Sequence, residues 1–245
     1  MENRLGAKAG KAFASFLLGI FFSFIFFPCE AQKSSPIVIV TFGNSTTAPR
    51  KGIDKVYAVR ITEDLKARGL DIKVINAGTP SSHSGSIKDN HFAKLAHGLD
   101  RFDTGVLRYK PDWVTINFGL NDSWQDKGPK TTSRIPVKAY RHNLSFYIDK
   151  IQENNGKVIL LTPNPVGKKF YGYHKKRLKK YRRAVRKLAR QENVALIDSW
   201  KLFERYIAGN HLEMDALLLD GIHPGDTGHD LIAKEIVRII AGLKD

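Results

Sequence analysis

Short apolar runs rich in β-branched residues alternate with amphipathic helical patterns along most of this 245-residue chain. Such runs are typical of buried strands, and strands that alternate with helices favour a mostly parallel sheet covered on both faces. We therefore expect an α/β fold, a three-layer α/β/α sandwich around a five-stranded sheet. The expected strands are Ile37–Phe42, Ile72–Ile75, Trp113–Phe118, Val158–Thr162 and Val194–Ile197.

Helical patterns fill the intervals between these strands. They cover about Tyr57–Arg68, Phe92–Tyr109, Val137–Glu153, Lys175–Gln191 and Thr227–Leu243. Right-handed crossovers through such helices place them on both sides of the sheet. No internal repeat or low-complexity linker divides residues 32–245, which indicates a single domain there.

The first 31 residues have a different composition from the rest of the chain. A basic start with Arg4, Lys8 and Lys11 precedes an uncharged stretch, residues 12–29, that is rich in Phe and Leu. Small residues at Cys29 and Ala31 then occupy the positions that a signal peptidase reads. We interpret residues 1–31 as a cleaved signal peptide, with an uncleaved N-terminal membrane anchor as the alternative. Both interpretations predict an exported domain, periplasmic or extracellular.

Cys29 is the only cysteine of the chain. Pro28 and two phenylalanines precede it instead of small residues, which argues against a lipid-modified cysteine. Cleavage after Ala31 would leave no cysteine, so the mature chain would have no disulfide, cysteine nucleophile or cysteine-based zinc site. The histidines show no metal-ligand spacing either, and we expect neither a metal nor a cofactor.

Much of the net charge of +16 comes from one segment. Residues 168–190 contain twelve Lys or Arg and no acid, with Leu178, Tyr181, Val185 and Leu188 spaced as the buried face of an amphipathic helix. A solvated basic face and a surface that attracts an anionic polymer or membrane surface both fit this pattern. No nucleic-acid-binding motif accompanies it, so nucleic acid is not an expected partner.

Four polar clusters follow expected strands or precede the last helix. Loops that follow parallel strands emerge at one edge of the sheet, so clusters far apart in sequence can converge there. The clusters are Gly43-Asn44-Ser45-Thr46-Thr47, Asn76-Ala77-Gly78, Gly119-Leu120-Asn121-Asp122 and Asp220-Gly221-Ile222-His223-Pro224.

Each cluster offers a group that acyl transfer requires. Ser45 could attack a carbonyl carbon, and we expect its backbone N–H near a helix start that favours negative charge. The N–H of Gly78 and the amide of Asn121 could donate to the tetrahedral oxyanion. His223 could act as general base and then as acid, with Asp220 holding its tautomer.

The four clusters, in this order, resemble the blocks of the SGNH/GDSL hydrolase family of esterases and lipases. This resemblance implies a flavodoxin-like sandwich and hydrolysis of an ester without a metal. It assigns Ser45 as nucleophile, Asp220 and His223 as the rest of a triad, and Ser45, Gly78 and Asn121 as the oxyanion hole. The family usually has aspartate in place of Asn44; asparagine can still cap the turn but removes a negative charge.

The leading functional hypothesis is an exported esterase that removes short acyl groups, foremost O-acetyl, from a carbohydrate. The segment Arg205–Leu219 is too polar for an apolar lid, the first cluster resembles those of carbohydrate acetylesterases, and Trp124 could stack on a sugar ring. A lysophospholipase or thioesterase acting on longer acyl chains is the alternative among enzymes. A non-catalytic glycan-binding module on the same scaffold is the alternative from another class.

Overall fold

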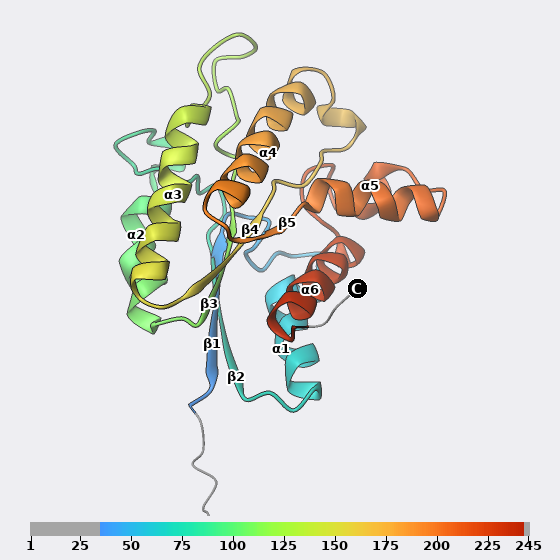
Figure 1. Cartoon of the computed structure of the whole chain (residues 1–245). Coiled ribbons are helices and arrows are strands. Elements are labelled where there is room, and N and C mark those ends of the chain that lie inside the picture. The colour runs from blue at the N-terminus through green and yellow to red at the C-terminus, as the bar shows by residue number, and fades with distance from the viewer. Residues whose placement is uncertain (1–34, 243–245) are drawn as a thin grey trace, which may run out of the picture. The chain divides into compact units, whose positions relative to one another are not determined.

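A five-stranded parallel sheet forms the centre of the domain, with strand order β2-β1-β3-β4-β5 (Figure 1). The computed structural model describes residues 35–242, so the expected signal peptide or membrane anchor lies outside the described residues. The strands are β1 (Ile37–Gly43), β2 (Ile72–Gly78), β3 (Trp113–Asn117), β4 (Lys157–Leu161) and β5 (Ala195–Ile197). The expected α/β fold with its five-stranded sheet is confirmed.

Helices cover both faces of the sheet, as Figure 1 shows. One layer consists of α2 (Gly98–Gly105), α3 (Val137–Glu153) and α4 (Tyr173–Gln191), which contribute to a single apolar cluster with the sheet. The opposite layer consists of α1 (Tyr57–Ala67), α5 (Ser199–Gly209) and α6 (Asp226–Ile240). Short 3-10 turns, η1 (Phe92–Lys94), η2 (Leu107–Tyr109), η3 (Lys168–Phe170) and η4 (Met214–Leu217), lie in the connections.

Strand β1 contributes to both apolar clusters, because successive side chains of a strand point to opposite faces. Val40 and Phe42 pack on the side of α2, α3 and α4, whereas Ile39 packs on the other side. The Phe42 ring contacts the rings of Phe118 and Tyr147, with centroid distances of 5.0 and 5.2 Å. β1 is therefore fixed from both faces of the sheet directly before the loop that carries Ser45.

Some element boundaries differ from the sequence-based expectation. β2 continues to Gly78, because residues 76–78 pair in register with residues 41–43 of β1 despite their low intrinsic strand propensity. The helix expected over Phe92–Tyr109 is wrong as a single element: it is η1, α2 and η2, with left-handed backbone at Ala93 and Lys94.

Helix α5 (Ser199–Gly209) was not expected, and the first five residues of the expected Arg205–Leu219 loop belong to it. Its N-cap is Asp198, whose carboxylate accepts a hydrogen bond from the backbone N–H of Lys201 at 3.3 Å. Trp200 and Phe203, three residues apart, are its large buried side chains. An Asp cap followed by apolar residues at this spacing indicates the start of a helix. In so short a segment the apolar pattern covers few turns, so the signal is weak.

Within residues 35–242, no helix has the length and apolar character that a membrane crossing requires.

Candidate active site

The loops after β1, β2 and β3 meet the loop before α6 around a cavity of about 260 Å³. The segment from β4 to the first turns of α4 closes its remaining side. The residues that line it are Ser45, Arg50, Pro80, Ser81, Phe92, Leu120, Asn121, Ser123, Trp124, Arg134, Val166, Phe170, His174, Leu178, Ile222 and His223.

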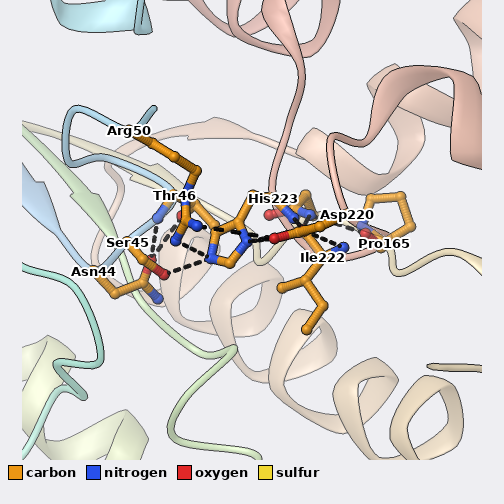
Figure 2. Close-up of polar contacts among 9 residues, drawn as sticks. Asn44, Ser45, Thr46, Arg50, Pro165, Asp220, Ile222 and His223 are labelled. Atoms are coloured by element: carbon orange, nitrogen blue, oxygen red, sulfur yellow. Dashed lines mark hydrogen bonds and ion pairs between the residues drawn. The ribbon is translucent and has the colours of Figure 1, made fainter. Parts of the chain in front are cut away.

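Ser45, His223 and Asp220 form a continuous chain of polar contacts (Figure 2). The Ser45 Oγ lies 2.9 Å from Nε2 of His223, and Nδ1 of the same ring lies 2.7 Å from Oδ2 of Asp220. Asp220 Oδ1 also accepts the backbone N–H groups of Ile222 and His223, at 3.1 and 2.9 Å. The tight loop therefore fixes the carboxylate against the ring.

The surroundings of His223 favour its neutral form. Burial lowers the pKa of His223 below its usual 6.5, and the nearby Arg50 cation also lowers it, while Asp220 acts in the opposite direction. Burial alone would raise the pKa of Asp220, but hydrogen bonds from His223 and Ile222 lower it. A neutral ring that donates from Nδ1 to a carboxylate presents its lone pair at Nε2, where Ser45 lies.

Ser45 lies in a turn and not at a helix start, so the expectation of a helix N-terminus there is wrong. α1 begins only at Tyr57. The backbone carbonyl of Asn44 accepts the N–H groups of Thr47 and Ala48, each at 3.1 Å. This closed turn places Ser45 at the edge of the sheet.

Asn44 holds the turn with its side chain as well as its backbone. Its Oδ1 accepts from the backbone N–H of Thr46 at 2.9 Å and from the Thr46 hydroxyl at 2.7 Å, and the side chain is buried. Its Nδ2 has no hydrogen-bond partner among the described residues. Asparagine thus supplies the acceptor that this turn uses, although its amide nitrogen is left unsatisfied.

Gly78 is not brought to the cavity. Its N–H donates to Oδ1 of Asn76 at 2.9 Å, inside the last residues of β2. A Cβ at this position would collide with the backbone of Thr47 and Ala48. Gly78 therefore allows β2 to pack closely against the Ser45 turn, and its N–H has a partner already.

Ser81, which the sequence patterns did not single out, lines the cavity instead. Its φ of 64° lies in the left-handed region that favours glycine. Its backbone N–H, like that of Ser45, has no hydrogen-bond acceptor within residues 35–242. A serine in a polar loop carries no signal for this conformation, so the sequence alone could not indicate it.

The amide of Asn121 is held in one orientation. Its Nδ2 donates one hydrogen to the carbonyl of Ser82 at 3.0 Å, and its Oδ1 accepts from Nη1 of Arg134 at 3.3 Å. Asp126 holds the Arg134 guanidinium with contacts of 2.7 and 3.0 Å. Because the oxygen is bonded to a donor, the second N–H of Asn121 remains available at the cavity.

Asp122 joins two of the loops from inside. Its buried carboxylate accepts the backbone N–H groups of Gly119 and Ser84, both at 2.9 Å. Burial raises the pKa of this carboxyl. The Asn121 loop and the loop that contains Ser81 are thus tied together by one side chain.

No three His, Cys, Asp or Glu side chains within residues 35–242 are grouped so that they could hold a metal ion.

A family model for the GDSL-like lipase/acylhydrolase family matches residues 41–231. The chain belongs to this family, also called SGNH, and it is a carboxylic ester hydrolase. This leaves the non-catalytic glycan-binding module without support. A crystal structure of a lipase/acylhydrolase from Enterococcus faecalis, 30% identical, covers 84% of this chain and 96% of its own, with a TM-score of 0.68.

Other similar proteins have names that specify a substrate. An acetylxylan esterase of Geobacillus stearothermophilus is 25% identical over 173 residues, which cover 70% of this chain and 73% of the esterase. A crystal structure of an acetylxylan esterase from that organism has the same fold, with a TM-score of 0.66 at 24% identity, over 84% of this chain and 94% of its own. Solved structures of that esterase include catalytic mutants in which a serine, an aspartate or a histidine is changed to alanine.

An uncharacterized lipoprotein, YqeF, of Bacillus subtilis (strain 168) is also similar. It is 26% identical over 254 residues, which cover 94% of this chain and 96% of the lipoprotein.

Asp122 joins the Asn121 loop to the loop that contains Ser81, and its removal should lower the stability of the domain. Asp122→Ala leaves two buried N–H groups without an acceptor, and each costs about 1–3 kcal/mol, so the free energy of unfolding in urea should fall by about 2–6 kcal/mol. Asp103 is exposed on α2, and Asp103→Ala should change it by less than about 0.5 kcal/mol. Equal effects of the two substitutions would contradict the structural role of Asp122.

Proposed function

We propose that this ester hydrolase removes O-acyl groups, foremost O-acetyl groups, from carbohydrates through a Ser45–His223–Asp220 triad. The observation that carries the proposal is the polar chain from the Ser45 hydroxyl through the His223 ring to the Asp220 carboxylate, at the wall of a cavity. A serine, an aspartate and a histidine also define catalytic mutants of the similar acetylxylan esterase.

In the proposed mechanism, the Ser45 Oγ attacks the acyl carbonyl carbon while Nε2 of His223 takes the hydroxyl proton. Asp220 stabilises the imidazolium that forms. His223 then gives this proton to the leaving sugar oxygen, so the carbon–oxygen ester bond breaks and the acyl group stays on Ser45. A water molecule, deprotonated by His223, then attacks the carbonyl carbon of this acyl-serine. The bond from that carbon to the Ser45 Oγ breaks, His223 returns the proton to the Oγ, and the carboxylic acid is released.

The negative charge on the tetrahedral oxygen needs donors that are already in place. We propose the backbone N–H groups of Ser45 and Ser81 together with Nδ2 of Asn121. All three residues line the cavity, and each has an N–H that no described residue accepts. Ser81 takes the place that the sequence pattern gave to Gly78, whose N–H is bonded to Asn76.

Two features support a short acyl group on a sugar. The cavity of about 260 Å³ is smaller than the ~300–1,000 Å³ typical of drug-sized ligands, which favours a short acyl group. Trp124 lines it, with ring contacts to His174 and Phe170 at centroid distances of 3.9 and 6.4 Å, and an indole at the wall of a cavity can pack on a sugar ring. The similarity to an acetylxylan esterase points the same way.

Longer acyl chains are the second candidate, and one observation favours them. The wall of the cavity formed by Val166, Phe170 and Leu178 is apolar and continues into a buried cluster with Trp200. Such a wall could also accept the first carbons of a fatty acyl chain. A lysophospholipase or thioesterase therefore stays the alternative.

The basic helix α4 has two kinds of cation. Arg182 and Arg186 ion-pair with Asp198, and Arg177 donates to Ser133, so these arginines stabilise the fold. The remaining cations on the exposed face are Lys176, Lys179, Lys180, Arg183, Lys187 and Arg190.

We propose that this exposed face attracts an anionic polymer or membrane surface. His174 and Leu178 of the same helix line the cavity, so a bound polyanion would lie near the reacting ester. Turnover of a charged polymer should then fall as salt rises from 0.1 to 1 M, because the screening length shortens from ~10 to ~3 Å. A rate that does not depend on salt would show that the exposed cations of α4 serve only to solvate the helix.

Export is proposed from the N-terminal sequence and from the similarity to a lipoprotein. Mass spectrometry of the mature N-terminus tests it. Cleavage after Ala31 is the expected result. A lipid-modified Cys29 would contradict that cleavage site while keeping export, and an intact N-terminus in the cytoplasmic fraction would contradict export.

Acyl-chain length separates the two candidate activities. We expect kcat/KM to be highest for acetyl esters, on p-nitrophenyl esters and on acetylated xylan or pectin, because the cavity is small. The measurement is a series from two to twelve carbons with the purified domain. A preference for chains of eight carbons or more would contradict the acetylesterase proposal.

The oxyanion donors lead to a paired prediction. Asn121→Ala should lower kcat by on the order of 10²–10³ with little change in folding, as expected for the loss of one preorganised donor. Ser81→Gly keeps the backbone N–H and suits the left-handed φ, so it should keep activity. If Ser81→Gly lost activity as severely as Asn121→Ala, the Ser81 hydroxyl and not its N–H would be the functional group.

A further inference from the structure

Two donors point at the same nitrogen of His223. Nη2 of Arg50 lies 2.7 Å from Nε2, and the Ser45 Oγ lies 2.9 Å from it (Figure 2). A neutral imidazole that donates from Nδ1 has one lone pair, at Nε2. Arg50 and Ser45 therefore compete for it, and a full hydrogen bond to Arg50 weakens the one that draws the proton from Ser45.

The Arg50 cation also opposes the charge that the reaction creates. When Nε2 takes the Ser45 proton, the ring becomes an imidazolium that faces a guanidinium, and guanidinium groups stay charged in proteins. The like charges repel, and the new hydrogen on Nε2 would face a hydrogen of the Arg50 guanidinium. Efficient turnover requires Arg50 to turn away or to receive an anion.

Arg50 lacks a close anionic partner of its own. Its nearest carboxylate contact is Nη1 to Oδ2 of Asp220 at 3.8 Å, and its buried Nε has no hydrogen-bond partner within the described part of the chain. The other arginine at the cavity, Arg134, is held in contrast by Asp126 at 2.7 Å. The described residues that line the cavity include no carboxylate.

We propose that Arg50 binds a carboxylate of the substrate beside the ester, so that this enzyme prefers acetylated uronic-acid sugars to neutral ones. This inference rests on the proposed esterase function. A carboxylate matches the planar fork of a guanidinium with two parallel hydrogen bonds. Once so engaged, Arg50 leaves Nε2, and the lone pair of His223 is free for Ser45. Binding of an acidic sugar thus makes Nε2 of His223 available as the general base.

An anionic phospholipid headgroup offers related chemistry, and the sugar is favoured by the size of the cavity and by Trp124 at its wall. The experiment therefore compares mono-O-acetylated methyl galactoside with mono-O-acetylated methyl galacturonate, which differ in a hydroxymethyl or carboxylate at C6. Lysophosphatidic acid is the third substrate. The variants are Arg50→Gln and Arg50→Lys, with Lys51→Gln, an exposed neighbour that loses the same charge, as the control.

The parent enzyme should show kcat/KM about 10- to 100-fold higher for the galacturonate ester, in keeping with a charge-assisted hydrogen bond. Arg50→Gln should abolish this preference, mainly by losing rate on the galacturonate ester, whereas its rate on the galactoside should rise because the competing donor is gone. Arg50→Lys should keep part of the preference, and Lys51→Gln should keep all of it.

Three outcomes would overturn the proposal while leaving the esterase intact: no preference for the galacturonate ester, an equal loss on both sugars in Arg50→Gln, or a stronger preference for lysophosphatidic acid. Titration calorimetry with galacturonate gives a readout independent of turnover. Binding that is lost in Arg50→Gln and unchanged in Ser45→Ala supports the Arg50 site. Absent binding to the parent overturns it, whatever the protein hydrolyses.

Discussion

The parallel pairing of β1 with both of its neighbours is the constraint on which the site depends. Gly43 at the end of β1 pairs with Gly78 of β2 on one side and with Asn117 of β3 on the other. The three strands thus end at the same level, and their loops start side by side. A side chain at Gly43 would collide with Thr47 and with the Asn117 carbonyl. This level edge is what brings Ser45, Ser81 and Asn121 to one cavity.

The polar groups of the site are held mainly by backbone donors. Asp220 accepts two backbone N–H groups of its own loop, and Asp122 accepts one from its own loop and one from the loop after β2. These bonds fix the groups before substrate arrives, which is how preorganised sites stabilise developing charge. His223 lies between two opposite influences, the Asp220 carboxylate and the Arg50 guanidinium. An anionic substrate that occupies Arg50 would shift this balance toward the carboxylate.

Much of this arrangement could be predicted from the sequence. The strand–helix alternation predicted the sandwich, and the clusters at strand ends predicted that Ser45, Asn121 and His223 would meet at one cavity, which they do. The failures have local causes. Glycine offers an unobstructed N–H, which makes Gly78 the predicted donor, but β2 continues through Gly78 and the Asn76 side chain accepts its N–H.

Other features depend on geometry that residue types do not encode. A serine in a sequence does not indicate a positive φ, so the sequence could not identify Ser81 as a residue of the cavity. Arg50 and Arg134 follow no motif, and their importance comes from where their guanidinium groups end, at His223 and at Asn121. Helix α5 was missed although Asp198 and the spacing of its apolar residues were readable. Long side chains and loop conformations are set by tertiary contacts, which is why these residues required the structure.

The central claim is that His223, held by Asp220, activates the Ser45 hydroxyl. The most direct measurement is labelling of the purified protein with a serine-directed phosphonate, followed by peptide mass spectrometry. The account predicts one adduct, on Ser45, that forms far more slowly in His223→Ala although the variant remains folded. An adduct on Ser81 or Ser123, which line the same cavity, or labelling that does not depend on His223, would contradict it.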